Sequence, residues 1–145
     1  MTKFPEQRLR RLRKNTAIRK LRRETSLSVN DFIYPIFVTH GKNIRDSIDA
    51  MPGIHRLSID NLAVEVQKAY KLGIQAILLF GIPEKKDALG SDSYNSNGII
   101  QLAIKAIRKH TPDILIITDV CMCEYTDHGH CGLIENGLVN NDKTL

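Results

Sequence analysis

The chain has 145 residues, of which 42% are hydrophobic and 26% are charged, so it can form one globular domain with a real core. No apolar run is long enough to span a bilayer, and no apolar secretory segment follows the N-terminal arginines. An arginine-rich, acid-poor start can indicate an organellar transit peptide, but serine is scarce in this segment. The count of three cysteines is odd, so disulfides alone would leave one thiol over, which favours a reducing, cytoplasmic setting.

The first 25 residues are strongly basic. They carry ten lysines and arginines against two glutamates, a formal charge of +8, whereas the whole chain sums to +5 and the remainder to −3. We predict a basic arm over residues 1–28 and a body over residues 29–145. Such an arm can bind nucleic acid or an anionic surface, but Phe4 is its one aromatic residue for base stacking. We therefore favour an arm that is solvated or lies on a neighbouring subunit, with no nucleic-acid or membrane partner.

Three apolar runs in the body are predicted strands, within residues 32–38, 75–83 and 113–120. The first run is nearly continuous in β-branched and aromatic residues, which is typical of a strand buried on both faces. Pro35 is an awkward member of the first strand because it cannot donate to a ladder. A turn is predicted over residues 49–53, where Pro52 and Gly53 stand together.

Two helices are predicted between these strands. The first starts at Ser58 or Asp60, runs to about Lys71 and is ended by Gly73; the second covers residues 97–110. Apolar residues recur in both at helical spacing. These stripes are Leu62, Val66, Ala69 and Tyr70 in the first helix, and Ile99, Ile100, Ala103, Ile104 and Ile107 in the second.

Alternation of strands and helices, with strands starting about 40 residues apart, predicts an α/β fold of repeated βα units around a parallel sheet. Three parallel strands alone would leave both sheet edges open and one face short of cover. A helix N-cap among residues 140–142 is followed by only a few residues. We therefore expect the chain to be the first part of a larger α/β domain.

All three cysteines follow the third predicted strand, with the spacing Cys121-x-Cys123-x7-Cys131. The carboxyl ends of parallel strands are where α/β proteins place their chemistry. Sulfurs around a tetrahedral zinc are roughly 3.8 Å apart, whereas residues i and i+2 of a strand are about 6.6 Å apart. The backbone must therefore turn after the strand, and Gly129 and Gly132 allow the loop to bring Cys131 back.

Three thiolates fill three of the four positions of a tetrahedral zinc, and an open fourth position is typical of a catalytic site. His128 or His130 as a fourth ligand would instead make the site structural. Two other interpretations stay open: inert cysteines of a core, and a Cys131 nucleophile with a histidine base.

Two further residues are candidates at the same sheet edge. Asp119 ends the third strand and can orient a substrate amine or support a ligand, or it can be an ordinary loop or capping aspartate. Phe80, at the end of the second strand, is expected on the same rim, or simply in the core.

The stretch "DVCMCEYTDHGHCG" (residues 119–132) resembles the zinc-type signature of the porphobilinogen synthases, also called 5-aminolevulinic acid dehydratases. The resemblance runs from about Gln7 to Leu145. Further segments carry it: "RLRRLRKNTAIRKLRRET", "DFIYPIFV", "MPGIHRLSID", "ILLFGIP", "KDALGSDSY" and "NDKTL".

This resemblance implies the first βα units, about three, of a TIM (β/α)8 barrel, with an N-terminal arm that wraps a neighbour in a homo-octamer. It implies condensation of two 5-aminolevulinate molecules into porphobilinogen, with loss of two waters, in tetrapyrrole and heme biosynthesis. It assigns a catalytic Zn²⁺ to Cys121, Cys123 and Cys131, the active-site aspartate to Asp119 and a rim phenylalanine to Phe80. His130 matches a position of a secondary metal site in some members, and an allosteric Mg²⁺ would lie outside this chain.

The family also forms Schiff bases through two lysines on later strands, and here the sequence departs from the pattern. A Schiff-base lysine needs an apolar or cationic pocket to lose its proton, and no lysine of this chain lies within an apolar strand. We expect these lysines to be absent from the chain, which would then be inactive alone. The alternative is a stand-alone zinc-binding module with a regulatory or nucleic-acid-binding role.

Overall fold

The computed structural model describes residues 3–7 and 10–145 and divides into two compact units, residues 1–31 and 32–145. The first unit contains η1 (Arg11–Arg13), α1 (Thr16–Leu21) and η2 (Val29–Asp31). The Asn15 side chain caps α1 by accepting from the Ile18 amide at 2.9 Å. Every described residue of this unit except the half-buried Ile18 is exposed. Arg8, one of the basic residues of the predicted arm, lies outside the described residues.

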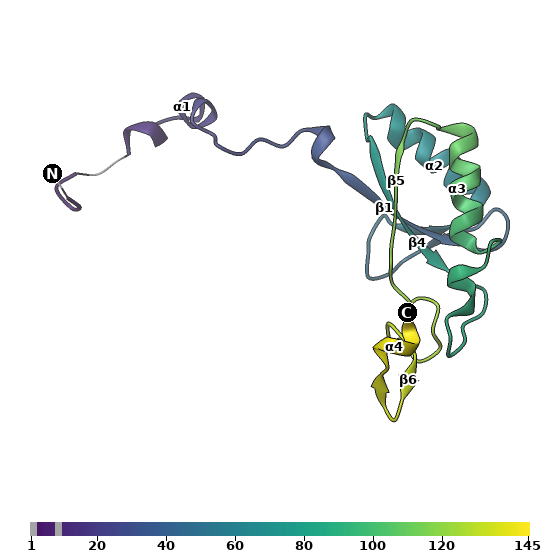
Figure 1. Cartoon of the computed structure of the whole chain (residues 1–145). Coiled ribbons are helices and arrows are strands. Elements are labelled where there is room, and N and C mark those ends of the chain that lie inside the picture. The colour runs from purple at the N-terminus through teal and green to yellow at the C-terminus, as the bar shows by residue number, and fades with distance from the viewer. Residues whose placement is uncertain (1–2, 8–9) are drawn as a thin grey trace. The chain divides into compact units, whose positions relative to one another are not determined.

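The second unit is built on a five-stranded sheet with the order β2-β3-β1-β4-β5, of which Figure 1 labels β1, β4 and β5. The three predicted strands are confirmed as β1 (Ile33–Thr39), β4 (Ala76–Ile82) and β5 (Leu115–Thr118). These strands are parallel, and β1 pairs with β4 along its whole length. The strand β5 pairs with β4 over four positions, and the last pair is Leu79 with Thr118.

Two short strands were not predicted: β2 (Arg45–Ser47) and β3 (His55–Leu57). They flank the predicted turn at residues 49–53, β2 pairs antiparallel with β3, and β3 is parallel to β1. The prediction that both sheet edges are open is therefore wrong on the β1 side. Neither strand has an apolar run, so no periodicity indicated it. The strand β3 pairs with β1 only at Phe37 and Val38, so Pro35 has a strand neighbour only on the β4 side. A proline is tolerated there because its missing amide donor is not needed by a second neighbouring strand.

Helices α2 (Ile59–Lys71) and α3 (Ile99–His110) cover one face of this sheet (Figure 1). Both predicted helices are confirmed, and Gly73, with φ +94°, follows the end of α2. The core forms where their apolar stripes meet the sheet. Its buried members are Ile36, Val38, Leu57, Leu62, Val66, Ile77, Leu79, Ile99, Ala103, Ile107 and Ile114.

The opposite face of the sheet is less covered. Ile33 of β1 and Leu115 of β5 remain 53% and 58% exposed, which agrees with the expectation that one face is short of cover. The prediction that the first strand is buried on both faces is therefore wrong at Ile33. The physical reason is that α2 and α3 both pack on the other face, because consecutive right-handed βα crossovers place their helices on the same side.

The remaining described elements are η3 (Ser91–Tyr94), β6 (Ile134–Glu135), β7 (Leu138–Val139) and α4 (Asn141–Thr144). Asn136 and Gly137 have φ values of 52° and 78° and form the β6–β7 hairpin turn, which an Asn-Gly pair commonly builds. The predicted N-cap is confirmed at Asn140, whose side chain accepts from the Lys143 amide at 3.1 Å. Among the described helices, none has the length and apolar character needed to cross a membrane.

Candidate metal centre

The loop that follows β5 brings the three cysteine sulfurs together. Cys121 Sγ and Cys123 Sγ lie 2.8 Å and 3.1 Å from Cys131 Sγ, and all three sulfurs are within 4.8 Å of one another. The Met122 amide also donates to Cys131 Sγ at 3.4 Å. The backbone therefore turns after the strand, as the sequence predicted, and brings Cys131 back to Cys121 and Cys123.

Local hydrogen bonds explain this turn. The amides of Tyr125 and Thr126 both donate to the Met122 carbonyl at 2.9 Å, which closes a helical turn directly after the first two cysteines. The buried Thr126 hydroxyl then donates to the His130 carbonyl at 2.9 Å and holds the returning part of the loop. Gly129, with φ +71°, provides the left-handed backbone that lets the loop reverse.

The three thiols share hydrogen bonds, which separates their pKa values. Hydrogen bonds from Cys121 and Cys123, together with the Met122 amide, lower the pKa of Cys131 to about 7. The hydrogen bond to Cys131 raises the pKa of Cys121 to about 12 and also raises the pKa of Cys123. Cys131 is therefore the first of the three to become a thiolate.

This donor set fits a metal ion. Three sulfurs that converge on one point are typical ligands of soft or borderline cations. The distances from Cys131 Sγ to the other two sulfurs are shorter than the roughly 3.8 Å between thiolates around a tetrahedral zinc, so Cys131 would move away from them by up to about 1 Å on binding.

Neither nearby histidine joins the sulfurs. His128 Nδ1 accepts from the His130 amide at 3.2 Å, its Nε2 lies 3.4 Å from the Ala88 carbonyl oxygen, and the two imidazole rings stack at 5.7 Å. Within residues 3–7 and 10–145, no group of three convergent metal-ligating side chains contains a histidine. The arrangement therefore favours three cysteine ligands and an open fourth position.

Asp119 lies beside the cysteines together with a residue that the sequence analysis missed. Ligand atoms of Asp119, Cys121 and Glu124 are within 4.8 Å of one another. Burial, and then the neighbouring Asp119 carboxylate, raise the pKa of Glu124. No sequence signal distinguished Glu124, since the signature leaves the position between Cys123 and Tyr125 unspecified.

Phe80 and Asp119 stand at the same end of the sheet, because each follows the last β4–β5 pair by one residue. The Phe80 ring stacks on Phe37 with centroids 5.2 Å apart, so part of its surface packs against the neighbouring strand. A hollow of about 370 Å³ is lined by Asp119, Cys121 and Tyr125 but not by Phe80. This volume is large enough for a small ligand.

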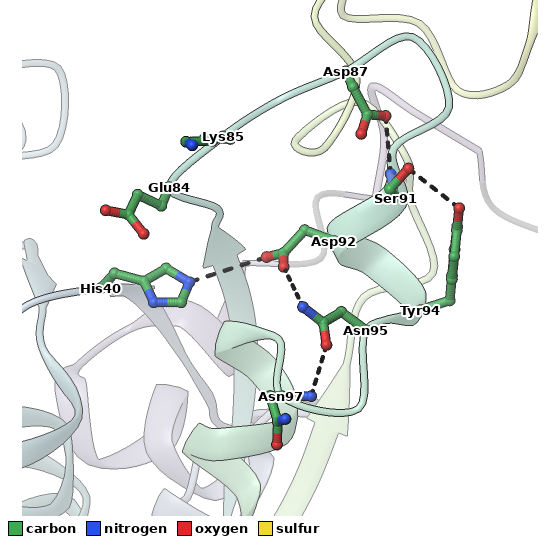
Figure 2. Close-up of a pocket in the computed structure, with 9 residues that line it drawn as sticks. All are labelled: His40, Glu84, Lys85, Asp87, Ser91, Asp92, Tyr94, Asn95 and Asn97. Carbon is green, nitrogen blue, oxygen red and sulfur yellow. Dashed lines mark hydrogen bonds and ion pairs between the residues drawn. The ribbon is translucent and has the colours of Figure 1, made fainter.

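A second, polar hollow of about 590 Å³ lies between the end of β1 and the loop after β4 (Figure 2). His40 Nε2 faces Asp92 Oδ2 across 4.0 Å, and Asp92 Oδ1 accepts from Asn95 at 3.1 Å. No sequence pattern indicated this hollow, because its residues are ordinary loop residues until the fold brings them together.

Comparisons with known proteins agree with the signature. A model of the family "Delta-aminolevulinic acid dehydratase" matches residues 6–145. The chain is 51% identical to the delta-aminolevulinic acid dehydratase of Methanothermus sociabilis, covering 99% of this chain and 44% of that protein. It is 48% identical to the Bacillus subtilis enzyme of the same name, covering 94% of this chain and 42% of that protein.

A solved structure shows the same fold. The chain matches delta-aminolevulinic acid dehydratase (porphobilinogen synthase) from Toxoplasma gondii, in complex with the reaction product porphobilinogen, with a TM-score of 0.89 and 37% identity. The match covers 95% of this chain and 40% of that one. The parallel strands β1, β4 and β5, with helices α2 and α3, thus correspond to part of a (β/α)8 barrel, and the predicted fold class is confirmed. The chain spans less than half the length of these relatives, and it belongs to the delta-aminolevulinic acid dehydratase family.

Proposed function

We propose that this chain supplies the metal-binding part of the active site of a porphobilinogen synthase, a hydro-lyase. The reaction condenses two molecules of 5-aminolevulinate into porphobilinogen with loss of two waters, in heme and porphyrin biosynthesis. The observation that carries this proposal is the convergence of Cys121, Cys123 and Cys131 at the carboxyl edge of the sheet. Membership of the family supports it.

The proposed ligands are the three cysteines, and the proposed ion is Zn²⁺, because thiolates favour zinc over magnesium. When bound there, zinc would supply a Lewis acid that polarises a substrate oxygen. Cys131, with the lowest thiol pKa, would lose its proton first and start metal binding. The alternative of a stand-alone zinc module needs a histidine ligand, and His128 and His130 are engaged with each other instead.

Two other side chains have proposed roles in substrate binding. The exposed carboxylate of Asp119, next to the cysteines, would accept hydrogen bonds from the amine of one substrate molecule. Phe80 would shape the rim on the side of β4, where its ring is held against Phe37.

The Schiff-base amines are proposed to come from residues other than these 145. All eleven lysines of the chain lie among the described residues, and all are exposed. An imine-forming lysine needs an apolar or cationic pocket, which an exposed side chain does not have.

The basic arm is proposed to contact a neighbouring subunit in a cytoplasmic homo-octamer rather than nucleic acid or a membrane. Its described residues bury almost nothing within the chain, so they remain available to a partner. A regulatory Mg²⁺ site, if the assembly has one, is proposed to lie outside this chain.

A chimera tests the function. Residues 7–145 replace the matching segment of the Bacillus subtilis relative, and porphobilinogen formation from 5-aminolevulinate is measured by its colour reaction with dimethylaminobenzaldehyde. We expect turnover with about one zinc per chain, loss of both in Cys123→Ser, and no change in Lys105→Gln, a control on the exposed surface of α3.

Two results would overturn the proposal. A folded Cys123→Ser chimera that retains zinc and full turnover would show that the cysteines are not the ligands of the catalytic metal. Porphobilinogen formation by the 145-residue chain alone would show that the Schiff-base amines do not have to come from elsewhere.

A further inference from the structure

The loop that carries the cysteines has little support from the sheet. Between the end of β5 at Thr118 and the start of β6 at Ile134 there is no strand or helix, and Val120 is 99% exposed. A loop of this kind needs contacts elsewhere to keep three sulfurs within 4.8 Å of one another. The loop between β4 and η3 is a neighbour that provides such contacts.

Asp87 joins these two loops through its backbone. Its amide donates to the Tyr125 carbonyl at 3.3 Å, and its carbonyl accepts from the Asp127 amide at 3.2 Å, so an isolated parallel bridge links Asp87 to Thr126. The bridged residue, Thr126, is the one whose hydroxyl holds the His130 carbonyl, next to Cys131.

The Asp87 side chain keeps that backbone in place. Its Oδ1 accepts from the Leu89 amide at 2.9 Å and from the Ser91 amide at 3.0 Å, the second of which Figure 2 shows. These bonds, with the Gly90 amide on the Asp87 carbonyl at 3.2 Å, close a tight turn before η3.

The same turn packs directly against the cysteine loop. Gly90 has φ +60°, and a Cβ at this position would lie 3.1 Å from Met122 Cε and 3.4 Å from Tyr125 Cβ. Met122 stands between Cys121 and Cys123, and its amide contacts Cys131 Sγ. The turn therefore supports both sides of the cysteine cluster.

We propose that Asp87 is a positioning residue for the cysteine centre, which holds the loop in the conformation where the three sulfurs converge. This inference rests on the proposed metal site and adds a determinant from a different βα unit. Asp87 acts through the turn at Gly90 and through Thr126, and touches neither the sulfurs nor a substrate.

The test compares the 145-residue wild-type chain with Asp87→Ala, Asp87→Asn and the control Asp113→Ala, an exposed aspartate just before β5, at the opposite end of that strand from the cysteines. Zn²⁺ affinity is measured by competition with a chromophoric chelator. Loss of a supporting contact to a metal site typically weakens binding 10–100-fold. We expect a loss of about tenfold or more in Asp87→Ala, partial recovery in Asp87→Asn, whose amide oxygen can accept the same two bonds, and no change in the control.

Amide exchange of the metal-free proteins provides a second readout. Asp87→Ala should speed exchange at Tyr125, Thr126 and Asp127 while the amides of β4 and α3 stay protected. Wild-type affinity within twofold in a folded Asp87→Ala, or unchanged exchange in the cysteine loop, would overturn the inference. If that variant does not fold, Thr126→Val cuts the next link, and unchanged Zn²⁺ affinity there overturns it equally.

The two proposals fail separately. A wild-type chain that binds no Zn²⁺ contradicts the proposed function, whereas the exchange measurement, made without metal, still decides whether Asp87 orders the cysteine loop.

Discussion

The proposed binding of Zn²⁺ by the cysteine cluster should depend steeply on pH because each thiol must lose its proton before it becomes a ligand. Cys131 has a pKa of about 7, Cys121 has one of about 12, and the pKa of Cys123 is raised above its ordinary value of 9.0. At pH 7, Cys131 is therefore about half ionised, and the other two thiols are almost fully protonated. The sign follows directly: affinity falls as pH falls, and binding releases between two and three protons.

The structure gives the size of this effect between pH 7 and pH 6. The thiolate fraction of Cys121 falls about tenfold, and so does that of Cys123, because both pKa values lie far above this range. The thiolate fraction of Cys131 falls about fivefold, from one half to about one tenth. Apparent Zn²⁺ affinity should thus fall about 500-fold over this unit of pH.

The assay is Zn²⁺ competition against a chelator of known proton affinity, at several pH values. The Cys131→Ser variant should bind Zn²⁺ more weakly than the wild type. Its residual Zn²⁺ affinity should change about 100-fold per unit of pH, because two thiols still titrate. A wild-type dependence of tenfold or less between pH 7 and pH 6 would refute the reasoning, since it would mean that at most one thiol changes its protonation.

Two stability predictions follow from the packing. Val66→Ala should lower the free energy of unfolding by about 2 kcal/mol because Val66 is fully buried. Val64→Ala on the same helix should change it by less than about 0.5 kcal/mol, because the Val64 side chain is 50% exposed. Equal urea midpoints for the two variants would contradict the burial argument. Gly81→Ala should cost about 1–3 kcal/mol because its Cβ would lie 2.6 Å from Tyr125 Oη and 2.7 Å from Ile100 Cγ1; an unchanged urea midpoint would show that Tyr125 can move at no cost.

The sequence predicted the strands and helices whose signal is local. The apolar runs of β1, β4 and β5 and the stripes of α2 and α3 each repeat within a few residues, so periodicity was sufficient. It missed β2 and β3, whose short, charged segments pair through backbone groups that carry no side-chain pattern. It also missed the β6–β7 hairpin, although the Asn136-Gly137 pair is a recognised turn signal.

The candidate site divides in the same way. The sequence by itself identified the candidate ligands, since three cysteines and two histidines follow a parallel strand, and the signature indicates the family. Only the tertiary structure decided that the three sulfurs converge while His128 and His130 turn to each other, and that Glu124 lies beside Asp119. It also decided that Asp87, more than thirty positions before Cys121, is joined to the cysteine loop. The physical reason is that ligand identity is a property of single residues, whereas convergence depends on hydrogen bonds between loops that only the folded sheet brings together.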